Sequence, residues 1–556
     1  MSVSPATAPH LNLPLLTPAQ VREALLARRE IALIDVREED PFAQAHPLFA
    51  VQLSAGRIEL DAPWRLPRRD VLIAVYDDGE GLAGPAAARL VALGYTQVHL
   101  LADGNAAGAA PDVRNNGLAA WRAAGGELFR DVNVPSKAFG ELVEHQRHTP
   151  SLPAEEVKAL LDGGADVVVL DARRFDEYQT MNIPGSTSVP GAELVLRARA
   201  LAPDPRTRII VNCAGRTRSI IGTQSLVNAG IPNPVAALRN GTIGWTLAGF
   251  TLDHGQQRRF GAVSETDRAA ARDAAQTLAD RAGARRIDAA GLAAWAADGS
   301  RTLYRWDVRS PEEYAAGHLP GFGSAPGGQL VQETDVFAAV RGARIVLADG
   351  GPLHDGVRAA ITAHWLAQLG WDVAWLTDTD PALFSETGAW VPARAAWPEV
   401  ATISPAQLAA QLEAGGTLLL DLTTSAQHVK AHIPGAHWVL RAQLAELLPS
   451  LPAAQRVVLT CGSSSLARFA AADLSRLSDT PVAVLAGGNA AWAADGRPLA
   501  PGDGQLASPR TDRYRRPYEG TDAPRAAMQA YLDWEFGLVE QLARDATHGF
   551  QVLAAA

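Results

Sequence analysis

The sequence predicts an α/β protein of four tandem units, each a small, mostly parallel sheet flanked by helices, followed by a C-terminal amphipathic helix. Three observations support this fold class. Four buried-strand patterns end in an aspartate, at Asp35, Asp171, Asp307 and Asp421. A second strand leads to a loop that begins 42 positions after the aspartate in three repeats and 40 positions after it in the fourth. Helical patterns fill the intervals, and strands that alternate with helices are typical of parallel sheets.

The repeat sets the expected boundaries of the units. The four units should lie at residues 12–130, 131–255, 287–395 and 400–505. Between the second and the third unit, residues 256–286 are rich in alanine and arginine and should form a helical linker.

The C-terminal extension, residues 506–556, begins with an arginine- and proline-rich stretch and continues with a helical pattern over residues 527–552. Four large apolar side chains fall on one stripe of that helix: Tyr531, Trp534, Leu538 and Leu542. We expect this stripe to be buried against one of the units. A dimer contact is the alternative, so a homo-oligomer stays open.

The bulk composition excludes several classes of protein. The 556 residues carry a formal net charge of −10, which argues against nucleic acid as the main partner. No apolar run reaches about 18 residues, so we expect no membrane partner, and the N-terminus lacks the pattern of a secretory signal. Two cysteines that lie 248 positions apart do not make a disulfide framework. These features favour a cytoplasmic protein, and the scarcity of lysine is typical of a GC-rich bacterial genome.

The most informative stretch of the chain contains the first cysteine. A β-branched run ends at Cys213, a turn with Arg216 and Arg218 follows, and a helical pattern begins near Ile220. Backbone N–H groups converge at such a turn, and the helix start is positive. We therefore expect the pKa of the Cys213 thiol to be lowered, which suits a nucleophile. The two guanidinium groups can bind an oxyanion such as thiosulfate in a forked geometry.

Other motifs accompany this loop in a fixed order. Three strand-end aspartates begin an Asp-x-Arg motif, a Pro-Gly turn follows in three repeats, and a late glycine-containing turn precedes a tryptophan in two. In this order the motifs resemble the rhodanese superfamily, over almost the whole chain. The resemblance implies a sulfurtransferase. Sulfane sulfur would pass from a donor such as thiosulfate or mercaptopyruvate to the loop cysteine as a persulfide, and then to an acceptor thiol or cyanide.

The predicted site centres on Cys213 as the catalytic sulfur carrier. The expected anion-binding loop consists of the six residues that follow it: Ala214, Gly215, Arg216, Thr217, Arg218 and Ser219. The resemblance places Arg173 near the substrate anion, with a structural ion pair as the alternative. Trp245 is a candidate for the pocket mouth, although packing is the favoured role. The expected partners are a small sulfur-containing anion as donor and a thiol or protein as acceptor.

The loops of the other three repeats are weaker candidates. Asp77 and Asp349 replace the cysteine and cannot carry sulfur, so the first and third units are expected to be inactive. Cys461 begins the fourth loop, which is similar at its first three positions to the loop of mercaptopyruvate-type sulfurtransferases. That loop has no arginine, and Thr423 stands where the Asp-x-Arg motif would place one. A second site at Cys461, weak or of different specificity, stays open.

Two other functions compete with this interpretation. Four such units could form a non-catalytic sulfur-relay scaffold or a persulfide-binding protein, which the three weakened loops favour and the intact Cys213 loop opposes. A phosphatase of the same fold family is the second alternative. Cysteine phosphatases need an arginine after five intervening residues, but Ser219 stands there and Arg218 comes one position early.

We expect no cofactor and no metal. The sequence has no P-loop and no dinucleotide-binding fingerprint. His428, His432 and His437 lie close together in sequence, but His432 belongs to the turn before Pro434-Gly435, as His318 does in the third repeat. A zinc site normally also recruits thiolate or carboxylate ligands in a set geometry.

Overall fold

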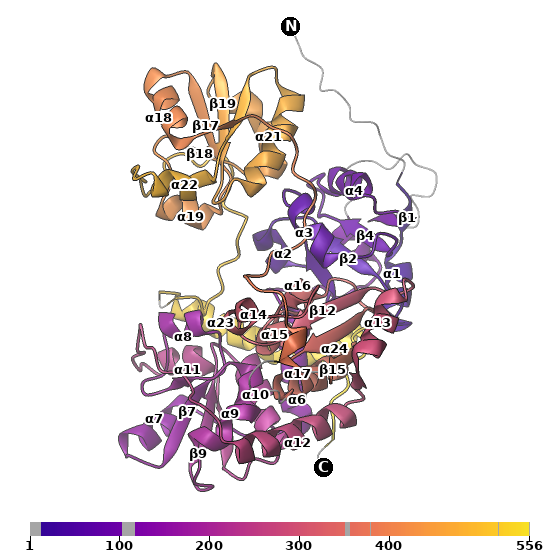
Figure 1. Ribbon diagram of the computed structural model, residues 1–556, viewed down its shortest axis with the longest axis vertical. Coiled ribbons are helices and arrows are strands. Elements are labelled where there is room, and N and C mark those ends of the chain that lie inside the picture. Colours follow the sequence, from indigo (N-terminus) through magenta and orange to yellow (C-terminus); the bar gives the residue numbers. More distant parts are fainter. Residues whose placement is uncertain (1–12, 103–116, 351–355, 378–379, 521, 555–556) are drawn as a thin grey trace.

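The computed structural model describes residues 13–102, 117–350, 356–377, 380–520 and 522–554. These residues form four five-stranded parallel sheets (Figure 1). The first sheet has the strand order β1-β5-β4-β2-β3, and the other three sheets repeat this order with their own strands. Helices flank each sheet, so the predicted α/β fold class with four tandem units is confirmed. We call the units first to fourth in chain order; residue 12, the expected start of the first, lies outside the described residues.

The first two units have matching elements in the same order. The first consists of β1 (Leu15–Leu16), α1 (Pro18–Leu26), β2 (Ala32–Asp35), α2 (Glu39–Gln44), β3 (Ala50–Gln52), α3 (Ile58–Arg65), β4 (Ile73–Tyr76), α4 (Ala83–Ala92), β5 (Val98–Leu101) and α5 (Gly117–Ala123). The second consists of β6 (Ser151–Leu152), α7 (Ala154–Asp162), β7 (Val167–Asp171), α8 (Phe175–Thr180), β8 (Thr187–Ser188), η2 (Gly191–Glu193), α9 (Leu194–Leu201), β9 (Arg208–Asn212), α10 (Thr217–Asn228), β10 (Val235–Leu238) and α11 (Gly241–Leu247).

The last two units repeat the pattern. The third consists of β11 (Arg285–Ile287), α13 (Ala289–Ala297), β12 (Leu303–Asp307), α14 (Pro311–Ala316), β13 (Gly323–Ser324), α15 (Gly327–Gln332), α16 (Thr334–Phe337), β14 (Arg344–Ala348), α17 (Val357–Gln368), β15 (Asp372–Leu376) and η3 (Pro381–Leu383). The fourth consists of β16 (Thr402–Ile403), α18 (Pro405–Ala414), β17 (Thr417–Asp421), α19 (Ser425–Lys430), β18 (His437–Trp438), η4 (Arg441–Gln443), α20 (Leu444–Leu447), η5 (Leu448–Ser450), β19 (Arg456–Thr460), α21 (Ser465–Leu477), β20 (Val482–Leu485) and α22 (Gly488–Ala494).

The register of each sheet places the strand-end aspartate beside the loop that follows the central strand. In the second unit Asp171, the last residue of β7, pairs with Asn212, the last residue of β9. In the fourth unit Asp421 pairs with Thr460 in the same way. Because the strands are parallel, their carboxyl ends lie at one edge of the sheet, where ligands bind in folds of this kind. The two cysteines directly follow Asn212 and Thr460 at this edge.

Two helices connect the first three units. Helix α6 (Val134–Arg147) precedes the second sheet and packs on α10. Helix α12 (Glu265–Arg281) lies within the segment expected to be a helical linker and packs on α9 and α17, so it contacts both the second and the third unit. A single hydrophobic cluster runs through the first three units, whereas the fourth unit has clusters of its own. The fourth unit accordingly lies to one side of the others in Figure 1.

The C-terminal extension crosses the molecule and ends among the first three units. The helix expected over residues 527–552 is two helices, α23 (Arg525–Phe536) and α24 (Leu538–Asp545), which join at Gly537. Both pack on α6, and Tyr531, Leu538 and Leu542 are buried. The apolar stripe therefore packs back on the chain itself (yellow in Figure 1). Across the described residues, no helix combines the length and the apolar character needed to cross a lipid bilayer.

Candidate active-site loops

The Cys213 loop connects the central strand β9 to helix α10, as predicted. Its shape is fixed by the start of α11, whose backbone amides at Thr242 and Ile243 donate to the carbonyl oxygens of Cys213 (2.9 Å) and Ala214 (3.0 Å). Gly241 has a positive φ of 53°, and a Cβ atom there would lie 2.3 Å from the carbonyl oxygen of Cys213. This position needs glycine because the two backbones approach so closely. Because the carbonyl groups of the loop bind the amides of α11, the N–H groups of the loop can point toward the sulfur.

The Cys213 thiol is buried, with 2% of the residue exposed. Its Sγ donates to the hydroxyl of Ser219 at 3.4 Å. Burial raises the pKa of Cys213, and the charge of Arg218 and the hydrogen bonds that the sulfur shares with the hydroxyl and the amide of Ser219 oppose this only in part. The expected lowering of the pKa is therefore not what the structure indicates. The sequence pattern predicted the positive loop but not the desolvation that outweighs it.

Arg216 points into a cluster of carboxylates. Its guanidinium donates to both oxygens of Glu141, at 2.7 and 2.8 Å, to Glu144, and to the side-chain oxygen of Asn240 at 3.1 Å. The side chains of Arg216 and Glu141 are 3% and 4% exposed. Glu141 and Glu144 come from α6, so Arg216 ties the loop to the helix that precedes the second sheet. This guanidinium has carboxylate partners and is not poised to bind an external anion.

Arg218 is paired as well, but it faces open space. Its guanidinium forms two hydrogen bonds with Glu177 of α8, at 2.7 and 2.8 Å. Burial alone would raise the pKa of Glu177, but the charge of Arg218 and its hydrogen bonds hold that pKa at about 2. Both side chains line a pocket of about 500 Å³, which Arg173 and Arg516 also line. Of the two loop arginines, Arg218 is the one placed to meet a ligand.

Arg173 and Trp245 make contacts that recur in other units. Arg173 binds the carboxylate of Asp171, with Nη2 2.8 Å from Oδ2, and Arg37 and Arg309 bind Asp35 and Asp307 in the same way. The same ion pair is thus present in the first and third units, whose loops carry aspartate in place of cysteine. Its presence there favours a structural role for the ion pair of Arg173 over a role in substrate binding. The indole of Trp245 donates to a backbone carbonyl six residues later at 2.8 Å, as do the corresponding tryptophans of the first and fourth units.

Helix α23 covers one side of the Cys213 loop. A Cβ atom added to Gly215 would meet Cε1 of Tyr531 at 3.1 Å and Oε2 of Glu535 at 3.4 Å. The hydroxyl of Tyr531 donates to Oε1 of Glu535 at 2.8 Å, whereas Oε2 is buried and has no partner among the described residues. Burial, with the nearby charge of Glu141, raises the pKa of Glu535 to about 8. A carboxyl group with a raised pKa, which favours its neutral form, therefore lies against the loop.

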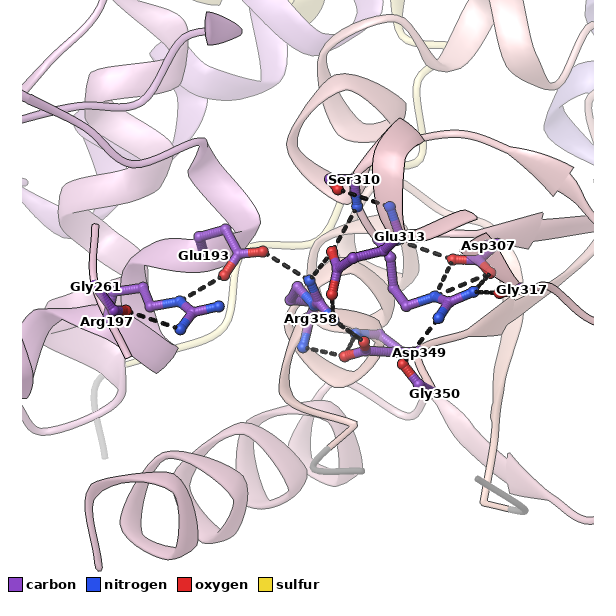
Figure 2. Close-up of polar contacts among 12 residues, drawn as sticks. Glu193, Arg197, Gly261, Asp307, Ser310, Glu313, Gly317, Asp349, Gly350 and Arg358 are labelled. Atoms are coloured by element: carbon purple, nitrogen blue, oxygen red, sulfur yellow. Dashed lines mark hydrogen bonds and ion pairs between the residues drawn. The ribbon is translucent and has the colours of Figure 1, made fainter. Parts of the chain in front are cut away.

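The loops of the first and third units show what their backbone geometry binds. The carboxylate of Asp77 accepts from the amides of Gly79 (3.0 Å), Leu82 (2.6 Å) and Ala83 (2.9 Å). The carboxylate of Asp349 accepts from the backbone amide and from the guanidinium of Arg358, at 2.8 and 3.0 Å (Figure 2). In both units an anion occupies the position after the central strand, held by N–H groups at the start of a helix. These loops already contain a negative charge.

The fourth unit differs from the second at the same edge. Cys461 is 5% exposed, and it lines a pocket of about 550 Å³. Among the residues that the structure describes, the strand-end Asp421 has no arginine partner. Instead it binds Nδ1 of His428 at 2.8 Å, while His432 binds the carbonyl oxygen of His428. Among the described residues, no three His, Cys, Asp or Glu side chains could together hold a metal ion.

The sequence matches the family described as "Rhodanese-like domain" at residues 17–110, 153–248 and 404–495, about half of the chain. The chain belongs to the rhodanese family. The matched residues include four of the five strands in each of the first, second and fourth sheets of this rhodanese chain. The third sheet has the same strand order as these three sheets, so the third unit has the same fold.

Of three known proteins that are similar to the chain, one matches it over nearly its whole length and two match it over short segments. The crystal structure of thiosulfate sulfurtransferase from Pseudomonas aeruginosa is 64% identical, with a TM-score of 0.93 over 98% of this chain and 100% of that chain. The HTH-type transcriptional regulator Rv0324 of Mycobacterium tuberculosis (strain ATCC 25618 / H37Rv) is 31% identical over 90 residues, 16% of this chain and 39% of that protein. An uncharacterized 16.5 kDa protein in the psaL 5' region of Synechococcus elongatus is 46% identical over 46 residues, 8% of this chain and 31% of that protein. The chain thus spans less than half the length of these two curated relatives.

The raised pKa of Cys213 in this rhodanese unit predicts how its reactivity depends on pH. In a Cys461→Ser chain, whose only thiol is Cys213, alkylation by a small neutral reagent should accelerate about four- to sevenfold per pH unit between pH 7 and 9, less than the roughly tenfold per unit of a thiol with no ionising neighbour. Glu535 ionises near pH 8 and its charge then disfavours the thiolate. The double variant Cys461→Ser/Glu535→Gln should therefore be alkylated as fast as Cys461→Ser at pH 7 and roughly two- to fivefold faster at pH 9. A rate that is flat between pH 7 and 9 would contradict the raised pKa.

Sequence reasoning missed the carboxylates around the Cys213 loop. It named Arg216 and Arg218 but gave neither Glu141, Glu144 nor Glu535 a role. The helical pattern around residue 139 did signal α6, and its two acidic residues, three positions apart, could have been tested against the loop arginines. No comparable signal places Glu535 against the loop, because it lies more than 300 positions away.

Proposed function

We propose that this rhodanese-type sulfurtransferase moves sulfane sulfur from thiosulfate, or a related small sulfur anion, to a thiol or cyanide through a persulfide on Cys213. The Cys213 thiolate attacks the sulfane sulfur of thiosulfate, the S–S bond of the donor breaks, and sulfite leaves with the bonding electron pair. A thiolate or cyanide then attacks the outer sulfur of the persulfide and releases the Cys213 thiolate. Neither step needs an external oxidant or reductant.

One observation carries this proposal. In the first and third units, a carboxylate occupies the position after the central strand and accepts hydrogen bonds from helix-start amides. The second unit has the same strand order and places Cys213 at that position. A thiolate or persulfide there meets the same kind of N–H groups, and these stabilise its negative charge. The similarity to a thiosulfate sulfurtransferase at 64% identity supports thiosulfate as the donor class.

The roles of the loop residues follow from their contacts. The backbone of residues 214–218 and Ser219 would hold the sulfur anion, and Ser219 already shares a hydrogen bond with the thiol. Arg218 would attract the donor from the pocket of about 500 Å³ that it lines. We assign Arg216 and Arg173 to positioning, because both guanidinium groups are held by buried carboxylates.

The experiment is to load the chain with thiosulfate and to locate the added sulfur by peptide mass spectrometry. We expect one extra sulfur on the peptide that contains Cys213. Cys213→Ser should lower thiosulfate:cyanide transfer by about 10³-fold or more, because serine cannot carry sulfur in this way. Cys461→Ser is the matched control and should keep most of this activity. Full transfer by Cys213→Ser would overturn the assignment.

A non-catalytic role has a specific observation in its favour: the thiol is buried, and both loop arginines already bind carboxylates. The same experiment separates the two functions. A sulfurtransferase releases sulfur to cyanide in repeated cycles. A persulfide-binding protein or relay scaffold would acquire one sulfur on Cys213 and keep it without turnover.

A further inference from the structure

A second pocket lies between the first and the fourth unit, far along the chain from Cys213. It has a volume of about 550 Å³, in the range of pockets that hold small organic ligands and well above the size of thiosulfate. The fourth unit contributes Cys461, Gly462 and Ser463, and the first unit contributes Ser54 and Arg57. Neither unit alone forms this pocket.

The Cys461 loop is hydrogen-bonded to α22 in the same way as the Cys213 loop is to α11, although Ser464 has a positive φ of 72° where Arg216 does not. Its carbonyl groups are held from behind: the amides of Asn489 and Ala490 donate to Cys461 (2.8 Å) and Gly462 (3.1 Å). A Cβ atom added to Gly462 would meet nothing within 4 Å, whereas one added to Gly215 would meet helix α23. Cys461 therefore begins a loop that a ligand can approach.

The two arginines of this pocket are compensated by carboxylates outside it. Arg57 binds Asp61, with Nε 2.7 Å from Oδ2. Arg441 binds Glu59 and Asp473, at 2.5 and 2.8 Å. Both guanidinium groups thus already have carboxylate partners, with which an anionic donor would have to compete.

Of the three acidic side chains that line the pocket, Glu39 binds Arg516 at 2.8 Å, whereas Asp512 and Glu38 accept hydrogen bonds from neutral groups. Oδ2 of Asp512 accepts from the backbone amide of Ser425 at 2.7 Å, and Glu38 accepts from the hydroxyl of Ser54 at 2.5 Å. Oδ1 of Asp512 is buried without a partner among the described residues, as is the hydroxyl of Thr423, which also lines the pocket. The unpartnered carboxylate oxygen of Asp512 can only accept, so it points to a ligand that supplies N–H donors, whereas the hydroxyl of Thr423 can either donate or accept. An ammonium group has both the donors and the charge that this site lacks.

We propose that Cys461 is the nucleophile of a second sulfur-transfer site, completed by the first unit, that takes thiols and persulfides bearing an ammonium group. The proposal rests on the persulfide chemistry proposed above for the family fold. The Cys461 thiolate attacks the outer sulfur of a persulfide R–S–S⁻, a new S–S bond forms, the donor S–S bond breaks, and R–S⁻ leaves with the electron pair. The reverse step passes the sulfur to an acceptor thiolate. The ammonium group of R binds Asp512, which orients the sulfur toward Cys461.

The test uses two persulfides of matched length and opposite charge, those of cysteamine and of 3-mercaptopropionate. The protein is the Cys213→Ser chain, in which Cys461 is the only thiol. We expect Cys461 to gain sulfur from the cysteamine persulfide at least about tenfold faster than from the anionic one. Equal rates, faster reaction with the anionic donor, or no added sulfur on Cys461 would overturn the proposal.

Asp512→Asn in the same background should abolish most of this preference, whereas Asp479→Asn, at an exposed aspartate of the fourth unit outside the pocket, should keep it. An unchanged preference in Asp512→Asn would contradict the assigned role of that carboxylate. The Cys461 peptide of the wild-type chain gives the same ratio if Cys213→Ser does not fold. Thiosulfate loading of Cys213 in a Cys461→Ser chain is measured separately, so failure of the second site is distinguishable from failure of the proposed function.

Discussion

Arg216→Met should destabilise the chain by about 3–5 kcal/mol. The substitution removes a buried guanidinium that binds Glu141 and Glu144, and it leaves these carboxylates beside Glu535 without a positive partner. Breaking one side of a buried ion pair costs far more than the net value of the intact pair, because the remaining charge stays desolvated. Denaturant unfolding monitored by circular dichroism measures the loss.

The control for this prediction is Arg206→Met, at an exposed arginine that pairs with Asp204 on the surface of the same unit. Exposed pairs contribute little, so the control should unfold like the wild type. Arg216→Lys should recover part of the stability, because it restores the charge but not the fork of hydrogen bonds. Unchanged stability of Arg216→Met, with a raised KM for thiosulfate, would instead make Arg216 a donor-binding residue.

The four sheets were predictable because their signals are local. Each strand-end aspartate and each loop start can be read within about 45 residues, and Asp35, Asp171, Asp307 and Asp421 are each the last residue of a strand. The loop after the central strand follows from the same pattern, so the position of Cys213 at the sheet edge was also predictable.

The charge state of the site was not predictable in the same way. It depends on which helices cover the loop, and those helices come from both sides of the second unit in the sequence: α6 precedes it, and α23 follows more than 270 positions after the end of α11. The amphipathic pattern of α23 shows that one face is buried, but not against which surface. The prediction of a lowered pKa for Cys213 was wrong for this reason. Burial of the thiol determines the direction of the pKa shift, and part of that burial comes from segments that are distant in the sequence.

The difference between the two cysteines has the same origin. The Cys461 loop has no arginine and looked weaker than the Cys213 loop by sequence alone. Its pocket is completed by Ser54 and Arg57, about 400 positions earlier in the chain. Only the packing of the first unit against the fourth, fixed by contacts such as Arg441 with Glu59, reveals which acidic and basic groups surround Cys461.

Arg358→Met should have the second large effect, again about 3–5 kcal/mol of lost stability. The side chain of Arg358 is 2% exposed and binds three carboxylates: Asp349 and Glu313 of the third unit and Glu193 of the second (Figure 2). The second and third units therefore share one buried cation. Its removal leaves Asp349 without a cationic partner and Glu193 with Arg197 alone, so we expect hydrogen exchange to accelerate in both α17 and η2.

The double variant Arg358→Met/Asp349→Leu distinguishes the cost of an uncompensated charge from the cost of lost packing. Asp349 and Arg358 are both buried, and replacing both partners of a buried pair with apolar residues of similar volume is often close to neutral. The double variant should therefore be more stable than Arg358→Met alone. If it is less stable, the carboxylate of Asp349 contributes mainly through the helix-start amides of Arg358 and Ala359, to which it also binds. That outcome would still show that the cysteine position of the third unit is an anion site that the chain fills with its own side chain.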